Sequence, residues 1–213
     1  MVVGAAPAVS MRRVDDAAAA PLIGVVEVFE DLQTVLRCCE RLVTELAADG
    51  EPDPVVVEAV WTTALLSYAR CFAATGDGVA LTESDLTSTR DLTSTEASPE
   101  VVEWHRLLLQ LRNHYADPAV NPRERFSVGV AQDANGRASG IAITSARQPL
   151  VDDLTVRQTG AIAYALSGLV NERIELRQKE VFDDLESWSK ADLDRLDPLD
   201  VAVPQADDAP ANS

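Results

Sequence analysis

The sequence contains little glycine and little cysteine. Ten of its 213 residues are glycine, and it has no Walker-type or dinucleotide-type glycine motif, which excludes phosphate-binding loops of those two kinds. Three cysteines occur, two of them adjacent at positions 38 and 39 and the third at position 71. This pattern fits reduced thiols better than a disulfide framework.

Histidine is also scarce, since His105 and His114 are the only two. They lie nine residues apart in one helical pattern, and the chain has no Cys-x-x-Cys pair. A zinc site needs about four convergent nitrogen or sulfur ligands, and these cannot be assembled here. We therefore predict neither a metal site nor a cofactor.

Positively charged residues are few: 18 Lys and Arg stand against 35 Asp and Glu, which gives a net charge of -17. Such a balance opposes nonspecific attraction to nucleic acid, so any RNA binding would need a local basic patch. No apolar run approaches the roughly 18 to 20 residues of a membrane span, and the N-terminus does not resemble a secretory signal. The sequence predicts a cytoplasmic protein with no membrane partner.

Apolar residues, mainly Ala, Leu and Val, make up 46% of the chain, and aromatic residues make up 5%. This composition and length favour one helical domain. We place a disordered leader at 1–20, a helical domain at 21–190, and an acidic, mostly disordered tail at 191–213.

Apolar residues recur at spacings of three and four in four segments, which predicts helices over about 22–48, 55–74, 98–117 and 150–188. Asp53-Pro54 and Ser98-Pro99 have the signature of helix starts. Between the second and third helices, Asp85 to Thr89 repeats as Asp91 to Thr95. Two copies are too few for a solenoid, so we interpret this segment as a polar loop or short frayed turn, or else a binding or phosphorylation segment.

The apolar period changes to two in "RFSVGVAQDANGRASGIAITS", residues 125–145. This alternation around Asn135-Gly136 predicts a β-hairpin with that dipeptide at its tip. The predicted fold is therefore all-α, a four-helix up-down bundle with a β-hairpin inserted before the last long helix.

The third predicted helix carries the candidate chemistry, Arg112, Asn113 and His114, near its end. On a continuous helix Arg112 and His114 point about 200° apart, so they meet only if the helix unwinds or a second subunit supplies one of them. The basic residues around them outnumber the acids and form a small positive island. Its candidate binding residues are Arg106, Arg123 and Arg125, to which we add His105.

Two segments, "ALLSYARCF" and "WHRLLLQLRNHYADPAVNPRE", followed by the hairpin and a long helix, resemble prokaryotic HEPN-like proteins over about residues 57–186. The resemblance implies an RNA-acting protein of a defence, toxin or stress system that dimerises through its third and fourth helices. It further implies metal-independent RNA cleavage, in which Arg112 binds phosphate, Asn113 orients Arg112 and His114 is the acid or base.

The sequence departs from this family where a later histidine is expected, because Asp117 stands there and His114 follows Arg112 by two residues. An aspartate near phosphate repels it. A second interpretation is therefore a noncatalytic dimeric helical module that binds a protein partner. In that case Arg112 and Asn113 would satisfy carbonyls at the helix end.

Overall fold

The computed structural model describes residues 11–14, 19–73, 79–89 and 98–199. Its helices are α1 (Ala20–Leu46), α2 (Pro54–Cys71), α3 (Glu83–Ser88), α5 (Ser98–Ala116), α6 (Asp153–Glu186) and α7 (Lys190–Leu193), and its strands are β1 (Glu124–Gln132) and β2 (Ala138–Arg147). The predicted combination of a mostly helical fold and one antiparallel hairpin is confirmed.

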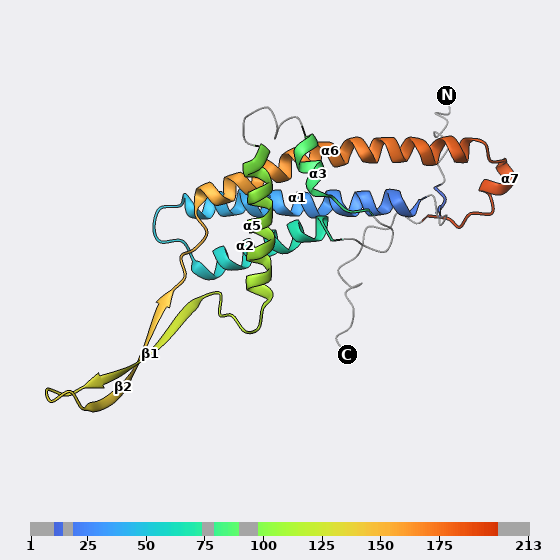
Figure 1. Cartoon of the computed structure of the whole chain (residues 1–213). Coiled ribbons are helices and arrows are strands. Elements are labelled where there is room, and N and C mark those ends of the chain that lie inside the picture. Colours follow the sequence, from blue (N-terminus) through green and yellow to red (C-terminus); the bar gives the residue numbers. More distant parts are fainter. Residues whose placement is uncertain (1–10, 15–18, 74–78, 90–97, 200–213) are drawn as a thin grey trace, which may run out of the picture.

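Helix α1 is the centre of the core. Figure 1 shows α2 and α6 lying along it, with α6 running in the opposite direction. The buried residues of α1 recur at the predicted spacing of three and four, and this spacing places them on one side of the helix. They are Gly24, Val25, Val28, Leu32, Val35, Cys39 and Leu42.

Helix α5 has a different orientation, since Figure 1 shows it crossing the other long helices. Leu108 of α5 is fully buried, and the Trp104 indole Nε1 donates a hydrogen bond to Thr159 Oγ1 of α6 at 3.4 Å. The up-down order that we predicted for four helices is therefore not confirmed.

Local capping explains where two helices begin. The Asp53 side chain accepts hydrogen bonds from the backbone N–H groups of Val55 and Val56, ahead of Pro54 in the first turn of α2. Asp152 accepts from the Thr155 N–H at 2.7 Å at the start of α6. Each carboxylate satisfies a backbone donor that has no partner within the helix.

The β-hairpin forms as predicted, and its register pairs Val128 with Ile143. Gly136 has a φ of 76° at the tip, a conformation that glycine adopts at no steric cost. Figure 1 shows the hairpin pointing away from the helices. No described helix covers it, because every residue of both strands is exposed except Glu124, which is half-buried.

The first copy of the tandem repeat forms part of α3 and is not a loop. Thr82 and Asp85 make a capping box there, and the Asp85 carboxylate is ion-paired with Arg173 of α6. The second copy, residues 91–95, lies outside the described residues.

Two short segments that we assigned to the leader and the tail are bonded to each other. The Arg13 N–H donates to the Asp197 carbonyl at 2.8 Å, and the Leu199 N–H donates to the Met11 carbonyl at 3.0 Å. This pairing follows α7, which Figure 1 shows at the opposite end of the molecule from the hairpin.

The central position of α1 gives a stability prediction. Leu32 is completely buried, and Leu32→Ala should lower the free energy of unfolding by about 2–5 kcal/mol, because it leaves a cavity between packed helices. Urea denaturation followed by circular dichroism measures this change. Leu176→Ala, on an exposed side of α6, is the matched control, and an equal loss in both variants would contradict the central role of α1.

Candidate functional site

The three residues predicted to be catalytic are exposed in the last turns of α5. Arg112 Nη1 donates a hydrogen bond to Asn113 Oδ1 at 2.9 Å. The His114 ring lies at the edge of the neighbouring Tyr115 ring, with 6.4 Å between their centroids. Arg112 and Asn113 are therefore brought together by the structure.

Arg112 and His114 are not brought together within one chain. Helix α5 continues unbroken to Ala116, past both residues, so their side chains leave the helix about 200° apart. The structure has no unwinding that would let them converge on one phosphate. A shared site would require one of the two residues to come from another molecule.

The predicted basic island is largely neutralised by local acids. Arg106 donates two hydrogen bonds to the Glu83 carboxylate, both at 2.9 Å, and this pairing lowers the pKa of Glu83 and raises that of Arg106. Arg123 forms a similar two-point contact with Glu58, at 2.9 and 2.6 Å. Arg125 is exposed on β1.

His105 lies in the core and not on the basic surface where we expected it. Its Nδ1 is 3.0 Å from the hydroxyl oxygen of buried Tyr68, and its ring centroid is 4.2 Å from that of Phe72. Burial lowers the pKa of His105, because the charged imidazolium loses its hydration there. The histidine thus fastens α5 to α2.

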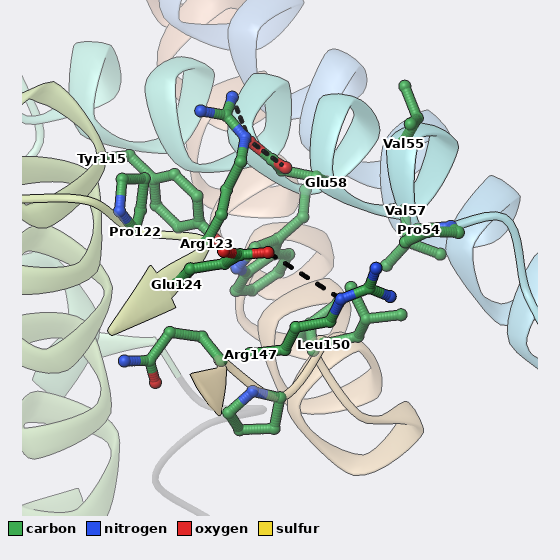
Figure 2. Close-up of a pocket in the computed structure, with 14 residues that line it drawn as sticks. Pro54, Val55, Val57, Glu58, Tyr115, Pro122, Arg123, Glu124, Arg147 and Leu150 are labelled. Carbon is green, nitrogen blue, oxygen red and sulfur yellow. Dashed lines mark hydrogen bonds and ion pairs between the residues drawn. The ribbon is translucent and has the colours of Figure 1, made fainter. Parts of the chain in front are cut away.

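A pocket of about 260 Å³ lies at the root of the hairpin, between the start of α2 and the end of α5. Figure 2 shows Arg123 reaching across to Glu58, while Glu124 lies opposite Arg147. The Arg147 Nε and the Glu124 Oε1 are 4.0 Å apart. The apolar part of the lining consists of Pro54, Val55, Val57, Trp61, Tyr115, Pro122, Pro149, Leu150 and Val151.

Among the described residues that line this pocket there is no Cys, His, Ser or Thr, and its two carboxylates, Glu58 and Glu124, face Arg123 and Arg147. Across the described ranges, no three His, Cys, Asp or Glu side chains group as metal ligands. Within the same ranges, no helix has the length and apolarity needed to cross a bilayer.

The hairpin presents the most unusual surface of the described chain. The register places five large apolar side chains on one face of the ribbon, since paired residues share a face. All five are more than half exposed: Phe126 57%, Val128 73%, Val130 55%, Ile141 72% and Ile143 72%. We call these five residues the apolar face of the arm, the arm being residues 123–148.

The opposite face of the hairpin carries small or polar side chains, with Gly129 paired to Ala142 and Ser127 paired to Thr144. An isolated two-stranded hairpin is at best marginally stable in water, and an apolar face needs cover. The sequence alternation contained the signal for these two faces, but we used it only to predict the hairpin. Within the residues that the structure describes, the hairpin has no third strand to cover it.

Comparisons of the sequence with protein-family models and with curated proteins, and of the structure with solved structures, gave no match. The resemblance to HEPN-like proteins therefore remains a prediction from the sequence.

The burial of His105 predicts a pH-dependent stability. Because the pKa of His105 in the folded protein lies below the value of about 6.5 in an unfolded chain, the unfolded chain takes up this proton at a higher pH than the folded protein does. Acidification from about pH 7.5 to about pH 5.5 should therefore destabilise the protein, by no more than about 1.4 kcal/mol per pH unit for one proton.

His105→Asn is the matched variant, since an amide can replace the contact with Tyr68 but does not titrate. Urea unfolding of both proteins over this pH range isolates His105, because exposed His114 is present in each. The free energy of the wild type should fall relative to that of the variant on acidification. Parallel curves would contradict the assignment.

Proposed function

We propose that this chain is a noncatalytic protein-interaction module whose binding element is the arm. The observation that carries the proposal is the apolar face, five large side chains held in register on a ribbon that projects from the helices. Exposed apolar patches of this kind mark protein contacts. Main-chain pairing between β1 and β2 places these five side chains on one face of the ribbon.

The chemistry at the end of α5 also favours binding over catalysis. Arg112 and His114 diverge on an unbroken helix, and Arg106 and Arg123 are already paired with carboxylates. A net charge of -17 adds repulsion toward a phosphate backbone. The root pocket lies beside the arm, where it can accept an apolar side chain of a partner.

A photoreactive amino acid at position 128 tests this proposal in living cells of the source organism. Irradiation should give discrete protein adducts, identified by mass spectrometry, because Val128 lies on the apolar face. The same amino acid at Thr144, on the opposite face, is the matched control and should give far fewer adducts. Ile143→Lys should remove the adducts formed at position 128, since a charge there interrupts the apolar face.

Equal labelling from positions 128 and 144 would mean that adducts form by collision and would refute the proposal. The absence of adducts from both positions would also count against it.

A metal-independent ribonuclease of the HEPN-like kind is the second candidate function. It is favoured by one observation: Arg112 and His114 are both exposed, and within the described residues neither forms an ion pair. Arg112 is thus accessible to a phosphate. Two chains would have to contribute to one site.

Cleavage of a mixed-sequence RNA in excess EDTA distinguishes the two functions. A ribonuclease should lose at least about 100-fold in rate in both Arg112→Ala and His114→Ala, because a positioned acid or base and a donor that stabilises charge on the phosphate each contribute about that much. Arg41→Ala, which removes another exposed arginine on α1, is the control. We expect no cleavage that depends on Arg112 and His114, and a loss in both variants would overturn the noncatalytic proposal.

A further inference from the structure

We infer that the partner of the arm is a second copy of this chain. The inference rests on the proposed function and deepens it. Two arms pack their apolar faces together in antiparallel orientation around a two-fold axis, so that the tip of each arm reaches the root of the other. The axis passes close to the Val128–Ile143 pair, which is the middle of the paired strands.

The apolar face is self-complementary. Its five residues are uncharged and lie on both sides of the central Val128–Ile143 pair, with Val130 and Ile141 toward the tip and Phe126, paired with Ser145, toward the root. The mutually paired Glu124 and Arg147 follow on the same side of the ribbon at the root. A two-fold contact needs one surface that fits itself, and it closes after two copies. A second arm packed on this face also supplies the contacts that an isolated two-stranded ribbon lacks.

The distribution of charge favours contact through the arms. Residues 123–148 hold four arginines and two acids, a net charge of +2, so the remaining residues carry -19. Two such bodies repel each other, whereas an arm is attracted to the body of the other copy. Antiparallel arms bring each basic arm close to the other acidic body, while the bodies remain at opposite ends of the assembly.

A stable interface needs more buried surface than the ribbon alone offers. Nine paired residues span about 30 Å, and sheet faces pack about 10 Å apart, so the ribbon offers a narrow strip. A stable interface buries about 800 Å² per partner. Val55 and Leu150, which line the root pocket, and Leu154 at the start of α6 are also exposed, and in the antiparallel arrangement the tip of the other arm would cover them.

Within the residues that the structure describes, no segment of this chain covers its own arm. Met11 and Leu199 are bonded to each other next to α7, at the end of the molecule away from the hairpin.

Sedimentation equilibrium of the purified full chain at micromolar concentration tests the inference. The wild type should have twice the 22.9 kDa mass of one chain. Val128→Lys and Ile143→Lys should each raise the dissociation constant by more than about 100-fold, because two lysines would be buried unpaired near the axis. Thr144→Lys, on the opposite face, should remain dimeric. Circular dichroism should show the same helical content in all four proteins, since the arm lies outside the core.

A cross-link locates the contact. In a Cys38→Ser background, which leaves only the buried Cys39 and Cys71, Ile143→Cys should be joined to its counterpart by a short bis-maleimide. Thr144→Cys should give much less linked dimer. A bis-maleimide is used because packed faces about 10 Å apart are too distant for a disulfide.

A monomeric wild type, or a dimer that both lysine variants leave intact, would overturn the inference. These outcomes are separate from a failure of the proposed function. If the purified protein is monomeric but position 128 still labels a different protein in cells, the arm is an interaction element and its partner is not a second copy. If position 128 labels nothing in cells and the chain is monomeric, both proposals fail.

Discussion

Burial of the apolar stripe of α1 between α2 and α6 is the interaction on which the rest of the described structure depends. Leu32, Val35 and Leu42 are completely buried there. Helix α5 reaches this core through Leu108 and the buried His105. Because the hairpin connects α5 to α6, the positions of these two helices determine where the arm leaves the body.

The root of the arm is held to the body by a specific contact. Arg123, directly before β1, binds the Glu58 carboxylate of α2 through two nitrogens. Exposed ion pairs contribute only about 0–1 kcal/mol, and two-point geometry puts this one at the upper end of that range. This contact affects the direction in which the arm projects more than it affects stability. A small change of angle at the root moves the tip of a ribbon of about 30 Å by a large distance.

The sequence predicted the elements well, since these follow local rules. Spacings of three and four located the helices, Asp53 capped α2 as expected, and Asn135-Gly136 marked the tip of the hairpin. The crossing of α5 was beyond such reasoning, because periodicity shows which face of a helix is buried but not the angle at which it packs.

The candidate site was predicted less well, for a related reason. His105 next to Arg106 suggested a basic surface, but burial and charge pairing are decided by residues distant in the sequence, Tyr68 for the histidine and Glu83 for the arginine. Motif reasoning treated each basic residue as free. In a chain with 35 acids and 18 bases, an exposed arginine is more often paired than available.

This excess of acidic residues affects how the arm can associate with other copies of the chain. A projecting apolar ribbon would normally risk open-ended aggregation, because its two edges can pair with any other strand. Here every copy also carries a body of charge -19, and bodies of like charge repel one another. In the dimer that we propose, face-to-face contact between two arms would keep the bodies at opposite ends, whereas a third copy on a ribbon edge would bring another body close to them. On this proposal, the negative charge outside the arm would limit association of the arm to a pair.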